Sequence, residues 1–470
     1  MNDKETIRRR IGYLLSESGV IGQDHLDETV ELAWPRVVTG FAIMSMRTVD
    51  LALIGIVLGA SGVAGLAVAN SFWMVGKFAY IGLAGGTLSL VSQNFGGGDN
   101  ATARAVVVAS FVGIGVVSIG LIPAFMYYAH ELIATLSSGS AVTQHGARYL
   151  LFVAPALFFE GISLIGSRTY AAIGNTLTPM YVRASGAVLN IMLSVIFVFG
   201  FNLDVIGVAL GTTVSTVIVS VAFLLGIGGV VPWSTVPQVQ ITQETPLPSS
   251  DLFTSLLSVS APLVGRRIAQ GIVVFPLLWI AGNFGAVTLA ALGVARQIRN
   301  LLNSFSWGFS IAASTLVGQS LGNADETAAA VYGTEIIKFS AIIFVVASSF
   351  VMVGGQPIAG LFVSQSQTGI TTQFIQVAAV SGIAAGVDGS ISGVLRGAGD
   401  THTPFYATLV GSYLIALPLA WGGTVTMLGV NGLLLALIAE KTIPVIINGR
   451  RFRTGSWKEI SRQYRPSQHS

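Results

Sequence analysis

The sequence lacks cysteine and is poor in charge, and both absences limit what the protein can be. None of the 470 residues is Cys, which excludes disulfide bonds and thiol chemistry. Only 10% of the residues are charged, whereas a soluble domain has about 25%. The hydrophobic fraction is 52% and the mean hydropathy is +0.75. This composition is typical of a chain embedded in a lipid bilayer.

Motifs of several enzyme classes are missing as well. The chain has no His-x-x-Glu-His zinc motif, no Gly-x-x-x-x-Gly-Lys phosphate loop and no cysteine cluster. Residues 59–62 resemble the Gly-x-Ser-Gly of intramembrane serine proteases, with His130 or His145 as a candidate base. However, this tetrapeptide lies in a predicted turn, and its repeat partner at 285–288 has no serine. We therefore expect no enzymatic activity.

Long apolar segments dominate the rest of the chain. A membrane-spanning helix needs roughly 20 apolar residues, and the sequence contains about twelve such stretches. Because the stretches are unbroken rather than alternating, they predict helices and not barrel strands. The predicted helices lie near residues 31–56, 62–92, 101–128, 147–167, 179–200, 205–229, 253–281, 287–317, 327–353, 370–396, 404–427 and 429–449.

Basic residues are distributed unevenly over the gaps between these stretches. The gaps at 59–61, 130–145 and 354–368 contain no Lys or Arg. Since cytoplasmic gaps carry the excess of basic residues, we expect a multi-pass protein of the cell membrane with both termini in the cytoplasm. The basic residues in or beside the other gaps and in the tails include Arg8, Arg9, Arg10, Arg104, Arg168, Arg183, Arg396, Arg450, Arg451 and Arg453.

The second half of the chain repeats the first about 226 residues downstream, from position 92 to position 318. Residues 92–99 return as 318–325, and residues 174–179 return as 399–404. A duplicated membrane chain predicts two similar bundles, and transporters hold their cargo between such bundles. We therefore expect an all-α integral membrane protein, with about twelve transmembrane helices in two pseudo-symmetric six-helix lobes around a central cleft.

Composition sets the expected domain boundaries. The first 28 residues lack the continuous apolar core of a signal peptide and predict a cytoplasmic leader. A segment with four prolines separates the two halves and predicts a linker. The expected parts are a cytoplasmic N-terminal leader at 1–29, an N-lobe of six helices at 30–229, a cytoplasmic linker at 230–250, a C-lobe of six helices at 251–450 and a cytoplasmic tail at 451–470.

Four short motifs together resemble the multidrug and toxic compound extrusion (MATE) transporters. Residues 48–55 are similar to the family's Val-Asp-x-x-x-x-Gly run. Gln-x-x-Gly segments follow the second and eighth predicted helices, at 93–96 and 319–322. The segment 395–404, which ends in Gly-Asp-Thr-His-Thr-Pro, has a weaker copy at 170–179. The resemblance extends over nearly the whole chain.

This resemblance implies twelve helices in two lobes and export of organic cations or other amphipathic solutes, driven by inward flow of Na⁺ or H⁺. We expect a secondary active efflux transporter, a drug or toxin antiporter that works by rocking-lobe alternating access. The alternative in the same superfamily is a flippase-like transporter of lipid-linked or anionic amphiphiles. We expect Na⁺ or H⁺ as coupling ion and no cofactor. The expected partners are a small amphipathic solute and the lipid bilayer, with no nucleic acid, and the expected state is a monomer.

Ionisable groups inside the apolar stretches are the main candidates for function, because each costs about 2.5–3.5 kcal/mol on insertion scales. Asp50 lies in the first stretch, and Asn190, Ser194 and Thr212 lie at similar predicted depth in the fifth and sixth. Four oxygen-bearing groups at one level can coordinate Na⁺ or share a proton. Asp50, Asn190 and Thr212 form the candidate Na⁺ site.

In the family, the matching site has an Asp in the first helix, and an Asn and a second Asp four residues apart in the fifth. Here Asn190 is kept and Ser194 replaces the second carboxylate. Glu160, flanked by aromatic residues in the fourth stretch, is a candidate protonation site that replaces this acid. The alternative for Asp50 is an ion pair with Arg47, one turn away.

The second half offers a different set of charges. Asp388 lies in the tenth stretch, and Arg266 and Arg267 lie in the seventh. A cation site and a buried ion pair of Asp388 with either arginine are both open. Three further basic residues, Lys77, Arg296 and Arg299, occupy comparable places in the two repeats and are candidate cavity residues. If they face the cavity, an acidic amphiphile is a better cargo than a cation; if they pair with acids, this inference disappears.

Overall fold

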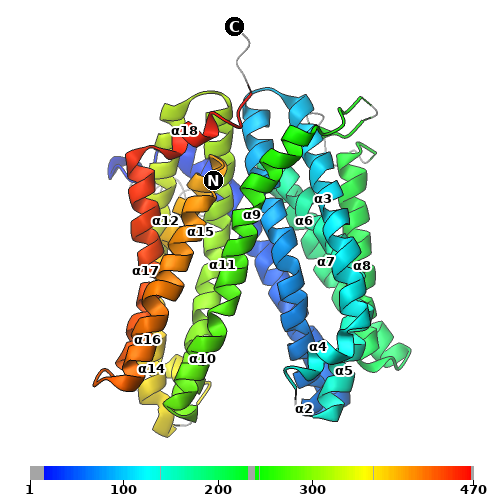
Figure 1. Cartoon of the computed structure of the whole chain (residues 1–470), viewed down its shortest axis with the longest axis vertical. Coiled ribbons are helices and arrows are strands. Elements are labelled where there is room, and N and C mark those ends of the chain that lie inside the picture. Colours follow the sequence, from blue (N-terminus) through cyan, green and yellow to red (C-terminus); the bar gives the residue numbers. More distant parts are fainter. Residues whose placement is uncertain (1–14, 138, 231–238, 243, 364, 467–470) are drawn as a thin grey trace, which may run out of the picture. The chain divides into compact units, whose positions relative to one another are not determined.

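The computed structural model describes residues 15–137, 139–230, 239–242, 244–363 and 365–466, and all the regular elements found there are helices (Figure 1). The longer helices of the first half are α2 (Gln23–Gly96), α3 (Asn100–Tyr127), α5 (Ser140–Val153), α6 (Ala156–Ala172), α7 (Leu177–Val195) and α8 (Asp204–Ile227). Those of the second half are α9 (Ser250–Ile272), α10 (Val274–Asn283), α11 (Ala286–Gly322), α12 (Glu326–Val353), α14 (Thr368–Gly397), α15 (His402–Leu409), α16 (Leu417–Val425) and α17 (Asn431–Thr454).

Shorter elements connect or extend these helices. They are α4 (Ala129–Ala134), the π-helical η1 (Ile196–Gly200), α13 (Gly355–Gly360), the 3₁₀ turn η3 (Gln365–Gln367), the π-helical η4 (Val410–Ala416) and α18 (Trp457–Ser461). Because η1 continues α7 and η4 joins α15 to α16, the helical runs 177–200 and 402–425 are each long enough to span a bilayer.

Helix α2 consists of two arms. A straight helix of its 74 residues would be roughly 110 Å long, several times the thickness of a bilayer core. Gly59 interrupts it with φ 62° and ψ −153°, a conformation that glycine adopts without the steric cost of a Cβ atom. The first arm therefore ends at residue 58 and the second begins at residue 60, where the sequence predicted the turn between the first two spans.

Each of the twelve ranges predicted from the sequence coincides with helical structure, which confirms the all-α membrane fold. By length and apolar character, nine helices of the described residues can cross a membrane, or ten with the bent pair α5–α6. This count takes α2 as one helix and does not include α11.

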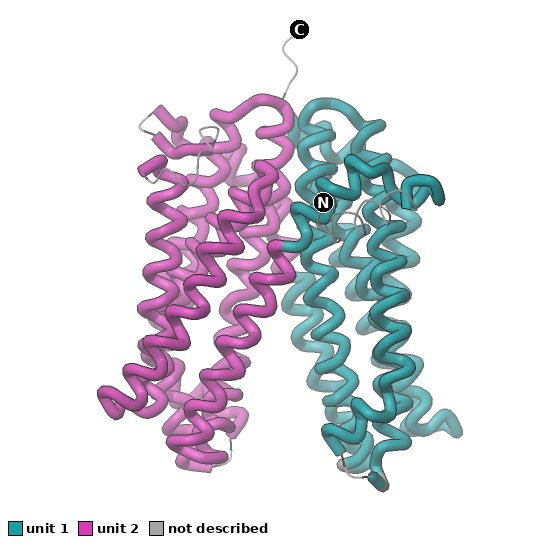
Figure 2. The backbone as a smooth tube through the Cα atoms, turned by 180° about the vertical axis from the view of Figure 1, so that it is seen from behind, with its two compact units in different colours: residues 1–34, 265–470 teal, residues 35–264 magenta. Residues whose placement is uncertain are grey.

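The chain divides into two compact units (Figure 2). Unit 1 comprises Met1–Trp34 and Gly265–Ser470, and unit 2 comprises Pro35–Val264. The unit boundaries thus fall inside α2 and α9 rather than in the predicted linker. Most of the proline-rich part of that linker, 231–238, and residue 243 lie outside the described residues, as do residues 1–14 of the predicted leader and 467–470 of the predicted tail.

In unit 2, α8 is the central helix, with α5, α6 and α7 packed against it. Tyr170 on α6 and Phe223 on α8 are buried together in one of its apolar clusters. In unit 1, α11 and α14 form the most extensive helix pair, and α12 and α17 pack on α14.

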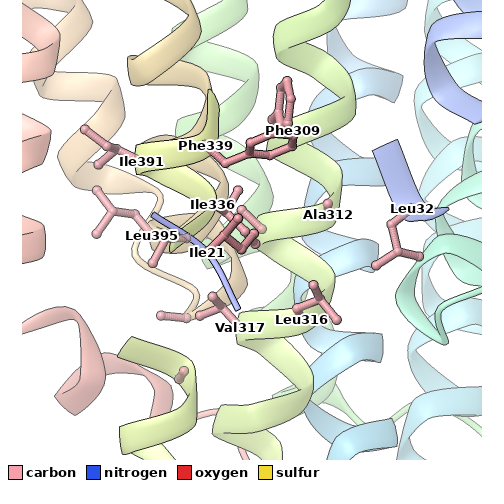
Figure 3. Close-up of a cluster of buried hydrophobic side chains, with 14 of the residues drawn as sticks. Ile21, Leu32, Phe309, Ala312, Leu316, Val317, Ile336, Phe339, Ile391 and Leu395 are labelled. Carbon is pink, nitrogen blue, oxygen red and sulfur yellow. The ribbon is translucent and has the colours of Figure 1, made fainter. Parts of the chain in front are cut away.

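The N-terminal segment 15–34 is part of the unit formed by the second half of the chain. Ile21 and Leu32 are buried in a cluster with side chains of α11, α12 and α14, including Phe309 and Ile336 (Figure 3). Polar contacts also hold this segment, since His25 Nδ1 lies 2.6 Å from Glu335 Oε2. The described part of the predicted leader is therefore packed protein and not a free extension.

Candidate functional site

Asp50 lies on the first arm of α2 and faces a cavity inside unit 2. The cavity has a volume of about 80 Å³, and the Asp50 residue is only 6% exposed. The lining side chains come from both arms of α2, from α5, α6, α7 and α8; they include Arg47, Asn70, Trp73, Lys77, Tyr149, Glu160, Arg183, Thr212, Ser215 and Thr216. Unit 2 thus brings an acid of the first span to a polar chamber formed by later spans.

The predicted oxygen cluster is assembled behind this chamber. Asn190 on α7 donates from Nδ2 to Thr212 Oγ1 on α8, at 3.1 Å, and Thr212 lines the cavity. Ser194, one turn further along α7, lies beside the Asp50 carboxyl. Both Asn190 and Ser194 are fully buried.

Asp50 Oδ1 and Asn190 Oδ1 are buried acceptors without a hydrogen-bond partner among the described residues, whereas the Ser194 hydroxyl lies beside the Asp50 carboxyl and has no other partner there. A buried polar atom without a partner costs about 1–3 kcal/mol, and these two acceptors belong to α2 and α7. A cation or a proton that enters the cluster supplies what these oxygens lack. The donor set contains one carboxylate and otherwise neutral oxygens, which suits Na⁺ or H⁺.

The structure does not support the alternative in which Asp50 pairs with Arg47. Arg47 lines the same cavity but is exposed, and no ion pair joins it to Asp50 among the residues that the structure describes. Tyr149 on α5 is a neighbour that sequence reasoning missed; it is buried and lies beside both Thr212 and Asp50. Its hydroxyl adds a further polar atom to the chamber, and no motif around it signals that role.

Glu160 occupies the same cavity in a different electrostatic setting. Lys77 Nζ lies 2.5 Å and Arg183 Nη2 lies 3.0 Å from its Oε1. An acid between two bases is already neutralised, and removing its charge leaves two cations without a partner. This arrangement argues against Glu160 as the protonation site that replaces the acid missing at Ser194. Lys77, predicted as a cavity cation, lines the cavity and is paired with Glu160.

In unit 1, the ion pair offered by the sequence is formed by Arg266 and not by Arg267. Arg266 Nη2 lies 2.6 Å from Asp388 Oδ2. Asn448 on α17 donates to the other carboxylate oxygen of Asp388 at 2.7 Å. The acid is thus fully engaged, and this pair occupies the place where a second cation site was considered.

Arg296 and Arg299 lie together at a second cavity, which is inside unit 1 and has a volume of about 180 Å³. Arg299 is buried and forms a two-pronged contact with Glu440, at 2.9 and 3.3 Å. Glu440 and its neighbour Lys441 on α17 were not singled out from the sequence. Charges inside an apolar stretch were the signal that could have found them.

The repeat explains why each cavity has a wall that corresponds to a wall of the other. With the offset of the repeat, Asn70 corresponds to Arg296 and Trp73 to Arg299; all four line the cavity of their own unit. The second arm of α2 and α11 therefore present equivalent faces, with Asn70 and Trp73 on one where Arg296 and Arg299 stand on the other. Duplication preserved the architecture while the chemistry of the two chambers diverged.

Comparison with known proteins agrees with this architecture. The MatE family model matches residues 35–196 and 262–421, well over half of the chain. The protein named "Probable multidrug resistance protein NorM" of Bradyrhizobium diazoefficiens is 28% identical over 426 residues, covering 86% of this chain and 88% of that protein. "Multidrug export protein MepA" of Staphylococcus saprophyticus is 23% identical over 374 residues, covering 79% of this chain and 80% of the relative.

Solved structures show the same fold. A crystal structure of MATE in the bent conformation matches with a TM-score of 0.86 at 18% identity, covering 94% of this chain and 97% of that one. A mutant of the Vibrio cholerae MATE transporter VcmN matches with a TM-score of 0.81 at 19% identity, covering 94% and 98%. The resemblance noted in the sequence motifs is thereby confirmed: the chain belongs to the MATE (MatE) family and is a multi-pass membrane transporter.

Proposed function

We propose that this protein is a secondary active efflux transporter that exports small amphipathic solutes in exchange for inward Na⁺ or H⁺. The family membership and the names of the relatives, which are multidrug resistance and export proteins, support efflux. Both termini lie in the cytoplasm in this proposal, in line with the distribution of basic residues over the gaps.

Asp50 is the coupling residue in this proposal, and one observation carries the assignment. The buried Asp50 carboxyl has an unsatisfied Oδ1 beside Ser194, and Asn190 Oδ1, one turn along α7 from Ser194, is a second buried acceptor without a partner among the described residues. Of the two acids that line this cavity, Glu160 already has two basic partners, whereas Asp50 pairs with none among the described residues. Asp50 is therefore the acid whose charge an incoming ion can neutralise.

Na⁺ and H⁺ would use the same atoms in different ways. Na⁺ would take oxygen ligands from Asp50, Asn190 and Thr212, as oxygen-binding cations do. A proton would convert the Asp50 carboxyl into a hydrogen-bond donor, and Ser194 Oγ or Asn190 Oδ1 could accept that hydrogen bond. Either ion removes the unfavourable combination of a buried charge and unpaired oxygens.

Ion binding drives export by shifting a conformational equilibrium. The occupied and empty forms of the Asp50 site favour different arrangements of the helices around it, so that one face or the other of the transporter is open. At 100 mV, one inward charge supplies about 2.3 kcal/mol, which corresponds to roughly a fifty-fold concentration ratio. A single coupled charge is sufficient for useful export.

Proteoliposomes with separately imposed Na⁺ and pH gradients test this function. We expect one of the two gradients to accelerate efflux of at least one dye from a panel of cationic, anionic and neutral dyes, and Asp50→Asn to abolish the acceleration. Asp204→Asn is the matched control: Asp204 is exposed at the start of α8 in the same unit, with φ 45°, a conformation that Asn accepts. Equal gradient dependence in Asp50→Asn and wild type would contradict the assignment.

A further inference from the structure

The cavity of unit 1 is strongly basic. Six cationic and two acidic side chains line it, a net of four positive charges. The cationic residues come from α9, α11, α14 and α17; they are Arg266, Arg267, Arg296, Arg299, Arg396 and Lys441. The two acids are Asp388 and Glu440.

Half of these cations form ion pairs with the acids. Arg266 pairs with Asp388 at 2.6 Å. Arg299 and Lys441 both pair with Glu440, with nitrogen-to-oxygen distances of 2.9 Å each. These pairs account for all the acidic charge of the cavity wall.

The other three, Arg267, Arg296 and Arg396, form no ion pair among the described residues. Arg296 Nη1 is buried and has no hydrogen-bond partner. Arg267 donates only a long bond to Gln270, at 3.3 Å, and its guanidinium lies 5.1 Å from the centre of the Trp307 ring. Arg396 donates to the Ser310 carbonyl at 2.7 Å, a neutral acceptor.

Unpaired guanidinium groups in a membrane protein require an explanation, because a buried charge without a counter-charge is costly. An arginine side chain presents five N–H donors in a planar fork that matches carboxylate, sulfonate and phosphate oxygens. Asn303 and Ser306 line the same cavity and add neutral polar groups. The volume of about 180 Å³ admits a compact head group and several waters.

We propose that Arg267, Arg296 and Arg396 form a binding site for the oxyanion group of an acidic organic solute. This inference rests on the proposed efflux function and names the class of its cargo: an organic phosphate, sulfonate or carboxylate. A cationic solute would meet four uncompensated positive charges in this cavity and would be repelled. The chemistry is shared by a soluble anion and by an anionic lipid head group.

Equilibrium binding to the purified full-length protein tests the proposal. Three probes have the same ring and differ in charge: phenyl phosphate, benzyl alcohol and benzylammonium. They are titrated calorimetrically into protein in phosphatidylcholine nanodiscs at fixed ionic strength. We expect heat of binding from phenyl phosphate and none from the other two. Binding of benzylammonium as tight as that of phenyl phosphate would overturn the proposal.

Glutamine variants locate the site. Arg267→Gln, Arg296→Gln and Arg396→Gln should each weaken phenyl phosphate binding about tenfold, or about 1.4 kcal/mol, the scale of a charge-assisted hydrogen bond. Arg453→Gln removes the same charge from an exposed position at the end of α17 and should leave binding unchanged. Equal effects of all four variants would show a general charge effect and overturn the site.

A conservative variant separates binding from folding. Arg296→Lys keeps the charge and should bind phenyl phosphate more tightly than Arg296→Gln, with an unchanged unfolding temperature. If a glutamine variant fails to fold, the proposal is tested by the selectivity of the wild-type protein among the three probes. A wild-type protein that shows no preference for phenyl phosphate overturns the proposal.

A lipid arm distinguishes the two sources of the oxyanion. The titration is repeated in nanodiscs of equal phosphatidylcholine and phosphatidylglycerol. Weaker phenyl phosphate binding there assigns the site to an anionic lipid, and unchanged binding assigns it to a soluble anion. Equilibrium binding needs no gradient. A protein that binds phenyl phosphate but shows no Na⁺- or H⁺-coupled efflux therefore contradicts the proposed function and not the binding site. A coupled exporter that ignores phosphate contradicts this site alone.

Discussion

Gly211 on α8 packs directly against Ser194 on α7. A Cβ atom at position 211 would lie 2.5 Å from Ser194 Oγ and 2.8 Å from the Ser194 backbone nitrogen. Because the second contact is with the backbone of α7, a side-chain rotation cannot relieve it. The two helices can therefore approach this closely only with glycine at position 211. This contact holds Ser194 beside Asp50.

Gly211→Ala should therefore disturb the Asp50 cluster from outside it. The added methyl group pushes α7 away from α8, and we expect a loss of about 1–3 kcal/mol of stability, typical of overpacking, together with weaker ion coupling. Thermal unfolding and gradient-driven efflux measure the two effects. Gly115→Ala on α3, where the new methyl group meets no atom within 4 Å, should leave coupling unchanged and keep or raise stability, since alanine favours a helix over glycine. A loss of stability equal to that of Gly211→Ala would contradict the packing argument.

Glu160→Gln should act on stability more than on coupling. It leaves Lys77 and Arg183 without their acid, and breaking a buried pair costs about 3–5 kcal/mol. We expect a markedly lower unfolding temperature for Glu160→Gln and a nearly unchanged one for Asp50→Asn, both measured in the same detergent. A stable Glu160→Gln protein that has lost only its Na⁺ or pH dependence would assign the coupling role to Glu160.

The N-terminal segment should contribute to the stability of unit 1. Ile21 is 1% exposed within the apolar cluster, so Ile21→Ala should cost about 2–4 kcal/mol through lost burial and the cavity that remains. Leu247→Ala, at a position 89% exposed, is the control and should have no measurable effect. If the two variants unfold at the same temperature, the segment is not part of the core.

A single substitution in the turn before α12 should stabilise the protein. Ala324 has φ 59°, a left-handed conformation that disfavours any residue with a Cβ atom. Ala324→Gly relieves this strain, and we expect a gain of about 1 kcal/mol in thermal unfolding. Asn323→Gly is the control, because Asn323 has φ −78° and gains nothing from glycine. A lower stability of Ala324→Gly would show that the turn is not strained.

The sequence predicted the helices and the location of the Asp50 cluster well because both depend on features that are regular along the chain. Apolar runs mark helices by length, and depth along a helix follows from a rise of 1.5 Å per residue. Asn190, Ser194 and Thr212 could thus be placed at the level of Asp50 from the sequence alone. The structure adds that Ser194 lies beside Asp50, that Asn190 donates to Thr212, and that Asp50 Oδ1 and Asn190 Oδ1 lack partners among the described residues.

The partners of the buried charges could not be predicted, because they depend on how each helix is rotated about its axis. Glu160 was expected to carry a proton, but two bases from α2 and α7 meet it. Glu440 pairs with Arg299 and Lys441 in the second cavity, on a helix whose charges were not singled out from the sequence. Long-range packing of the N-terminal segment had no local signature either.

The most direct test of the central claim compares downhill and uphill transport by Asp50→Asn in proteoliposomes. Downhill movement of solute needs only the conformational cycle, whereas accumulation against a gradient needs the coupling ion. We predict that Asp50→Asn still moves solute down its gradient but no longer accumulates it when Na⁺ or H⁺ gradients are applied, while Asp204→Asn does both. Uphill transport by Asp50→Asn at the wild-type rate would show that Asp50 is not the coupling residue.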